Sequence, residues 1–133
     1  MATESTDVIV VDDHDVYRNI LKKIISTVDH CRIVAEADSG IDAVNTVIRV
    51  PADLIAIDMR LPEMNGIDAI REIRKVSPIK ILVVSAMDDK DKIGEAMNAG
   101  ADGFFRKDLG IKTLEKAILE TLDGKKPVYT QAA

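Results

Sequence analysis

Val8-Ile9-Val10-Val11-Asp12-Asp13-His14, at residues 8–14, joins a short apolar run to two consecutive carboxylates. Four β-branched residues in a row, with no polar alternation, are typical of a strand that is covered on both faces, as in parallel sheets. In open parallel sheets, ligands bind beyond the carboxyl ends of the strands. This stretch therefore predicts a buried strand that delivers two acids to a ligand-binding edge.

Similar apolar runs recur at even intervals along the chain. They lie at Arg32–Ala37, Leu54–Ile57, Ile79–Val84 and Gly103–Phe105. The run Arg32–Ala37 alternates more with polar residues, which favours an edge strand. Helical periodicity fills the gaps between the runs, and in the first gap the predicted buried face consists of Val16, Ile20, Ile24 and Val28. Five strands alternating with five helices predict one doubly wound α/β domain with helices on both faces of a parallel sheet. Periodicity alone does not order the strands.

Two helix starts have clear capping signals. Ser39 precedes Asp42 by three residues, and Asn65 precedes Asp68 by three. A short polar residue followed by an acid at this spacing is typical of a helix N-terminus.

Length and composition bound the class of protein. The 133 residues suffice for one domain, which we place at residues 7–124 between a flexible segment at 1–6 and a tail or linker stub at 125–133. The apolar fraction of 47% and the net charge of −5 predict a globular, acidic domain that contacts neither nucleic acid nor a membrane directly. The single Cys31 excludes an internal disulfide and fits a cytoplasmic location.

Polar residues follow four of the predicted strands. They are Asp12, Asp13, Asp58, Ser85 and Lys107. Any one of them alone is explained as a turn residue, but all of them at strand ends favour a shared site. Three close carboxylates repel each other unless a cation lies between them, and an oxygen-only ligand set suits Mg²⁺, with Mn²⁺ as an alternative.

Four stretches carry a family resemblance. They are Val10–His14, Asp58–Gly66, Val84–Ala86 and Ala99–Lys107. Together they resemble the CheY-like receiver domain of bacterial two-component response regulators, over nearly the whole chain. The Asp-Asp-His start and Asp108 directly after Lys107, where many receivers have proline, are most similar to the NarL/FixJ (LuxR-type) subfamily.

The resemblance implies a flavodoxin-like (βα)5 fold with a five-stranded parallel sheet in the order 2-1-3-4-5. It implies that Asp58 accepts a phosphoryl group from a sensor histidine kinase. Asp13, Asp58 and the backbone carbonyl of Arg60 would hold Mg²⁺, and Asp12 would hold a metal-bound water. The phosphoryl oxygens would be bound by Ser85, Ala86 and Lys107.

The resemblance also implies a switch. Ser85 and Phe104 would change position on phosphorylation and alter the face formed by the fourth helix, fifth strand and fifth helix. We expect Phe104 to favour an inward position, because its ring has no hydroxyl to hold it toward solvent. Arg60 and Met87 would flank the approach of water and slow dephosphorylation, although both also fit as solvated rim residues.

Several functional classes remain beside this one. The leading hypothesis is a phosphorelay switch that catalyses only its own phosphorylation and dephosphorylation, forms a homodimer when phosphorylated, and regulates transcription when joined to a helix-turn-helix domain. The alternative is a stand-alone receiver or a pseudo-receiver that acts as a protein–protein interaction module. A haloacid-dehalogenase-type phosphatase needs an aspartate where this chain has Arg60. A flavodoxin-like electron carrier needs aromatic residues for FMN, and this chain has only 3%.

Overall fold

The computed structural model describes residues 5–87 and 89–130. The strands are β1 (Thr6–Val11), β2 (Cys31–Ala37), β3 (Leu54–Ile57), β4 (Lys80–Ser85), β5 (Gly103–Arg106) and β6 (Val128–Tyr129). The helices are α1 (Asp15–Thr27), α2 (Gly40–Arg49), α3 (Gly66–Val76), α4 (Lys90–Ala99) and α5 (Ile111–Leu122). Within the described ranges, no helix has the length and apolar character needed to cross a bilayer.

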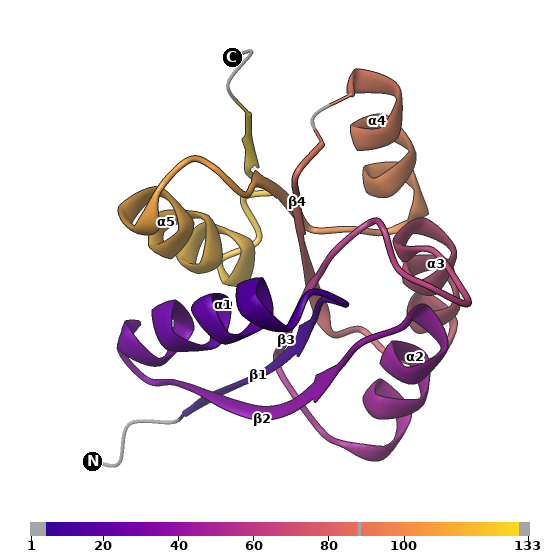
Figure 1. The fold of residues 1–133 in the computed structure, drawn as a ribbon, viewed down its shortest axis with the longest axis horizontal. Helices are drawn as coiled ribbons and strands as arrows, with labels where there is room; N and C mark the ends of the chain where they lie inside the picture. The colour runs from indigo at the N-terminus through magenta and orange to yellow at the C-terminus, as the bar shows by residue number, and fades with distance from the viewer. Residues whose placement is uncertain (1–4, 88, 131–133) are drawn as a thin grey trace.

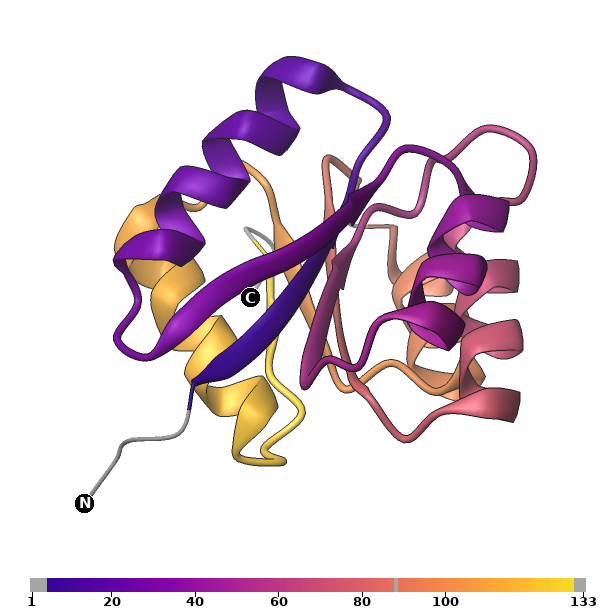
Figure 2. The same cartoon turned by 90° about the horizontal axis from the view of Figure 1, so that it is seen from below.

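The strands form one parallel sheet in the order β2-β1-β3-β4-β5-β6. Helices α1 and α5 cover one face, and α2, α3 and α4 cover the other (Figures 1 and 2). The doubly wound fold, the order of the first five strands and the edge position of β2 are confirmed. The strand order reverses between β1 and β3, which creates a crevice at their carboxyl ends.

Burial on both faces explains the unbroken apolar strands. In β1, Val8 and Val10 pack into the core beneath α1 and α5, whereas Ile9 and Val11 pack into the core beneath α2, α3 and α4. All four side chains have at most 1% of their surface exposed. A polar residue at any of these positions would lose its hydration without a partner, so the sequence has no alternation.

The prediction of five strands is wrong by one, because part of the segment expected to be a tail packs on the sheet. Val128 and Tyr129 pair in parallel with Phe104 and Phe105 of β5. The Phe104 amide donates to the Pro127 carbonyl at 2.9 Å, so β6 satisfies a backbone group that β5 would otherwise leave at an open edge. The Tyr129 hydroxyl also donates to Glu120 on α5.

The chain ends fall partly outside the described residues. Of the N-terminal segment expected to be flexible, residues 1–4 lie outside them, and Thr6 already begins β1. Residues 131–133 of the expected tail also lie outside.

The predicted inner face of α1 is wrong in its first half and correct at its end, where Val28 is buried and Ile24 packs against the core. Val16 is 74% exposed and Ile20 is 45% exposed, whereas the neighbouring row buries Leu21 and Ile25. Both rows are apolar and repeat every four residues, so periodicity does not distinguish them. The rotation of α1 places Leu21 and Ile25 in the core beneath α1 and α5. Arg18 contacts the carbonyl of Asp12 and the side chain of Glu36 on β2.

Both predicted helix caps are confirmed. The Ser39 hydroxyl accepts from the Asp42 amide at 3.0 Å, and the Asn65 side chain accepts from the Asp68 amide at 3.0 Å. Each bond satisfies one amide that the first helical turn leaves without a partner.

Arg74 joins the end of α3 to the end of α4, away from the carboxyl edge. Its guanidinium donates to the carbonyls of Gly100 (2.6 Å) and Ile79 (2.7 Å) and to the carboxylate of Asp102 (2.8 Å). Asp102 in turn accepts from the amide of Ile81 at 2.9 Å. This network satisfies backbone groups in the turns that hold the third and fourth βα units together.

Candidate functional site

The register of the central strands brings the predicted polar residues to one edge. Val11 pairs with Ile57, and Ile57 pairs with Val83, so β1, β3 and β4 end at nearly the same level. Ser85 pairs with Arg106, which extends this level to β5. The residues that follow these strands therefore converge, as the sequence predicts.

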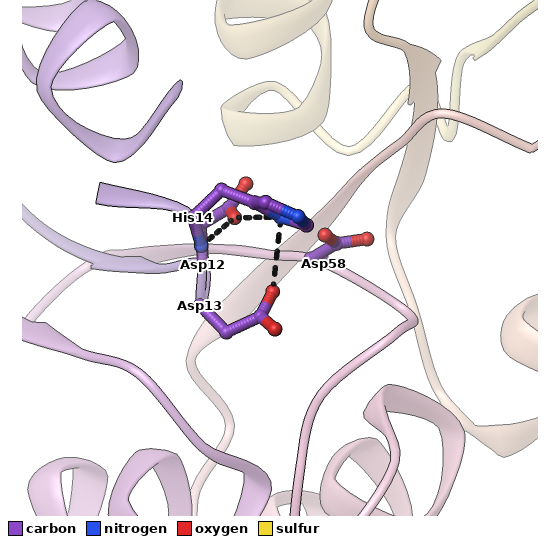
Figure 3. A group of neighbouring side chains, drawn as sticks. All are labelled: Asp12, Asp13, His14 and Asp58. Carbon is purple, nitrogen blue, oxygen red and sulfur yellow. Dashed lines mark hydrogen bonds and ion pairs between the residues drawn. The ribbon is translucent and has the colours of Figure 1, made fainter. Parts of the chain in front are cut away.

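An acidic cluster occupies the crevice between β1 and β3. Asp12 is 1% exposed and Asp58 is 4% exposed, while Asp13 lies at the surface. Figure 3 shows the side chains of Asp12, Asp13 and His14 on one connection and Asp58 on the neighbouring one. One donor atom from each of the four residues lies within 4.8 Å of all the others. The imidazole Nδ1 of His14 is 3.2 Å from Asp13 Oδ1.

This donor set fits a hard divalent cation. Three carboxylates supply the oxygen ligands that Mg²⁺ prefers, and the open side of the cluster leaves room for bound waters. The cluster therefore has the ligands of the divalent-cation site that the sequence predicts.

Lys107 supplies the positive charge of the cluster. Its Nζ donates to Asp12 Oδ2 at 2.8 Å and to Asp58 Oδ2 at 3.1 Å. Burial alone would lower the pKa of Lys107, but its hydrogen bonds and ion pairs with the two aspartates outweigh burial and raise that pKa. Lys107 is therefore a permanent cation between two buried carboxylates. The Lys107–Asp108 peptide bond, whose geometry the sequence leaves open, is trans.

Asp58 has an unfavourable environment for a charged group. Burial is the main cause that raises its pKa above the ordinary value, and the nearby charge of Asp12 adds to this. Lys107 and the Arg60 amide, which donates to Asp58 Oδ1 at 3.3 Å, oppose the shift without cancelling it. A poorly solvated carboxylate at the base of a crevice is suited to act as a nucleophile.

Ser85 lies at the end of β4 and is 1% exposed. Its hydroxyl accepts from the Met87 amide at 3.1 Å, and its carbonyl accepts from the Lys107 amide at 2.8 Å. Ala86, the next residue, is exposed. Phe104 is fully buried in the core beneath α2, α3 and α4, which is the inward position expected for it.

The two predicted rim residues contact each other. The Nε of Arg60 donates to the Met87 sulfur at 2.9 Å, which links the connection after β3 to the connection after β4. Both line an open groove of about 650 Å³ that begins at Asp13 and runs between α3 and α4 toward Arg71 and Glu95. The site is therefore open to solvent on this side.

Sequence reasoning missed two residues on the first turns of α1. The Lys107 ammonium lies 4.3 Å from the centroid of the Tyr17 ring. Arg18 donates to the backbone carbonyl of Asp12 at 2.7 Å and to Glu36 at 2.8 Å, which holds the β1–α1 connection against β2. Their spacing in the sequence could have identified them. Tyr17 and Arg18 lie four and five positions after Asp13, about one helical turn, which brings them back to the edge of the sheet.

Gly66 at the start of α3 allows the close approach of that helix to the site. A Cβ atom at this position would lie 2.3 Å from the carbonyl oxygen of Asp58. The amide of Gly66 donates to the Met59 carbonyl at 2.8 Å, which closes the loop that follows Asp58. The position thus requires glycine for steric reasons.

Comparisons with known proteins show the family of the chain. Residues 8–119 match the model of a family described as the response regulator receiver domain. The chain is 42% identical over 101 residues to the chemotaxis protein CheY of Thermotoga maritima, which covers 75% of this chain and 83% of that protein. It is 29% identical over 118 residues to the transcriptional regulatory protein DegU of Brevibacillus brevis, which covers 88% of this chain and 50% of DegU.

A solved structure shows the same fold. The signal receiver domain of the putative response regulator NarL from Mycobacterium tuberculosis superposes with a TM-score of 0.87 at 30% identity, covering 92% of this chain and 99% of that one. The chain spans half the length of DegU and 59% of the response regulator GacA of Pseudomonas aeruginosa.

Proposed function

Because this chain belongs to the response regulator receiver family, we propose that it is a phosphorelay switch whose phosphoacceptor is Asp58. The observation that carries this proposal is the burial of the Asp58 carboxylate at the crevice, in an acidic cluster and in contact with Lys107. The phosphoryl donor in the cell would be a sensor histidine kinase, as receivers of this family use.

The transfer is a substitution at phosphorus. A carboxylate oxygen of Asp58 forms a bond to the phosphorus atom while the P–N bond of a phosphohistidine breaks, and the leaving imidazole nitrogen takes a proton from water. The product is an acyl phosphate on Asp58. Water later attacks the phosphorus, which releases inorganic phosphate and restores the carboxylate.

Residues of this chain position the transferred group. Lys107 already contacts Asp58, so its ammonium is placed to bind phosphoryl oxygens. The Ser85 hydroxyl and the amide of Ala86 stand at the end of the neighbouring strand β4, from which they would bind the other oxygens. The chain needs only to orient and neutralise these charges, because such a transfer requires little further covalent chemistry.

Asp13, Asp58 and the backbone carbonyl of Arg60 would hold Mg²⁺ or Mn²⁺, and Asp12 would bind one of its waters. The cation supplies charge neutralisation between the carboxylates and the incoming phosphoryl oxygens. Asp12 and Asp13 follow β1 directly, so their positions are set by a strand with four buried side chains. This rigid support keeps the carboxylates together despite their repulsion.

The chain would catalyse only its own phosphorylation and dephosphorylation. Output would arise when Ser85 moves toward the phosphoryl group. Phe104, which is already buried on the neighbouring strand β5, would then repack the face formed by α4, β5 and α5. That face would form a homodimer or control a helix-turn-helix domain in a longer chain. This output and the cytoplasmic location expected from the sequence stay predictions.

Intact-mass measurement tests the proposal. The protein is incubated with Mg²⁺ and phosphoramidate, beside Asp58→Asn and beside a sample with EDTA. We expect the parent alone to gain the mass of one phosphoryl group, and only with Mg²⁺. An equal gain in Asp58→Asn, or none in the parent, would refute the assignment and favour an interaction module without phosphorylation.

A further inference from the structure

The position of Lys107 depends on more than the two aspartates. A lysine side chain is a flexible four-carbon stem that ends in an ammonium group with three N–H donors. Two contacts are the carboxylates of Asp12 and Asp58, at 2.8 and 3.1 Å. The third is the ring of Tyr17, whose centroid lies 4.3 Å from Nζ. These three neighbours match the number of donors.

Tyr17 is well placed to provide a fixed surface. It lies in the first turn of α1, directly after the connection that contains the acid pair. Its half-buried ring packs against the core beneath α1 and α5. The ring therefore cannot move away from Lys107 without losing contacts with that core.

An aromatic ring suits this position for an electrostatic reason. Its face attracts a cation through the ring quadrupole but carries no net charge. A further carboxylate here would add to the repulsion within the acidic cluster, and an aliphatic side chain would not attract the ammonium. The Tyr17 hydroxyl does not supply this negative charge, because burial, and then the charges of Asp12 and Asp58, raise its pKa to about 12.

We propose that Tyr17 is a positioning residue whose ring face holds the Lys107 ammonium at the phosphoacceptor Asp58, so that the donor now bonded to Asp58 can pass to an incoming phosphoryl oxygen while the side chain stays in place. The proposal rests on the proposed function of Asp58. It assigns the effect to the ring and not to the hydroxyl.

Two substitutions separate ring from hydroxyl. Tyr17→Phe keeps the ring, and Tyr17→Leu keeps an apolar side chain without it. With phosphoramidate and Mg²⁺, we expect phosphorylation of Tyr17→Leu, followed by intact mass over time, to be about fivefold slower than the parent, and that of Tyr17→Phe to stay within about twofold. Equal rates in all three proteins would overturn the proposal.

A double-mutant cycle tests whether Tyr17 acts through Lys107. In a Lys107→Met background, Tyr17→Leu should slow phosphorylation no further, because the cation that the ring holds is gone. A loss in rate as large as that in the parent background would show that the substitution acts through general destabilisation, and would refute the positioning role.

A second measurement does not depend on phosphoryl transfer. Carbon relaxation in NMR reports the mobility of the Lys107 Cε group, which should increase in Tyr17→Leu and stay unchanged in Tyr17→Phe. Unchanged mobility in Tyr17→Leu would overturn the proposal. If the parent gains no phosphoryl group at all, the proposed function of Asp58 fails, while this measurement still decides whether Tyr17 holds Lys107.

Discussion

Replacing Asp58 with asparagine should make the protein more stable when no divalent cation is present. The parent buries the carboxylates of Asp12 and Asp58 beside one ammonium, that of Lys107. Asp58→Asn leaves one buried carboxylate paired with one ammonium. Its side-chain oxygen keeps the shape needed to accept from the Arg60 amide. The substitution thus removes a charge and one acceptor of Lys107, but it retains the packing and the ion pair between Lys107 and Asp12.

The direction of the effect follows from the raised pKa of Asp58, whose main cause is burial. An acid whose pKa is higher in the folded than in the unfolded state lowers the free energy of unfolding at every pH at which it is ionised in both states. This cost is present at neutral pH and is relieved as the pH falls through the folded pKa. We expect Asp58→Asn to raise the free energy of unfolding by about 1 kcal/mol, the usual scale for a single substitution, which corresponds to about 4 °C in Tm.

Thermal and urea unfolding at pH 7 in EDTA measure this difference. Asp29→Asn is the matched control, because Asp29 is exposed and the same charge is removed. With excess Mg²⁺ the order should reverse, since a cation at one hundred times its Kd adds about 2.7 kcal/mol to the parent and less to a site with one carboxylate fewer. A lower stability of Asp58→Asn than of the parent in EDTA would show that the buried charge of Asp58 does not destabilise the fold.

Three further substitutions test other parts of the account. Arg60→Ala should shorten the lifetime of the phosphorylated protein roughly threefold, because it removes the contact with Met87 beside the path by which water approaches. An unchanged lifetime would contradict this role of Arg60. Gly66→Ala should lower the free energy of unfolding by about 2 kcal/mol and slow phosphorylation, because the new Cβ would overlap the Asp58 carbonyl. A urea midpoint and a phosphorylation rate equal to those of the parent would contradict this prediction. Arg74→Met should lower the free energy of unfolding in urea by about 2–3 kcal/mol, because the carbonyls of Ile79 and Gly100 lose a charged donor. An unshifted urea midpoint would show that water replaces this donor.

The central strands could be predicted because burial on both faces of the sheet requires unbroken apolar runs in the sequence. Runs such as Val8–Val11 and Leu54–Ile57 contain no polar residue, and each is buried throughout. The caps at Ser39 and Asn65 were equally predictable, because capping depends on residues three positions apart. These features are local or have a strict period.

The errors concern contacts between distant residues. The inner row of α1 depends on which of its residues meet a core built by distant strands, where Leu21 and Ile25 are buried. Strand β6 depends on the open edge of β5, more than twenty positions earlier in the chain. Two residues, Val128 and Tyr129, carry too short a pattern to be identified as a strand without that edge.

The site divides in the same way. Asp12, Asp13, Asp58 and Lys107 could be predicted, because a parallel sheet brings the ends of its strands together. The proposed role of Tyr17 could not be predicted. It depends on the direction of the flexible side chain of Lys107, which follows β5 and lies far from Tyr17 in the sequence.

Borohydride trapping identifies the phosphorylated residue itself. Reduction of an aspartyl phosphate converts that residue to homoserine, which peptide sequencing by mass spectrometry locates. After phosphorylation with phosphoramidate and Mg²⁺, we predict homoserine at position 58, and none there without Mg²⁺ or in the unphosphorylated protein. Homoserine at Asp12 or Asp13 instead, or its absence from a protein that has gained a phosphoryl group, would contradict Asp58 as the phosphoacceptor.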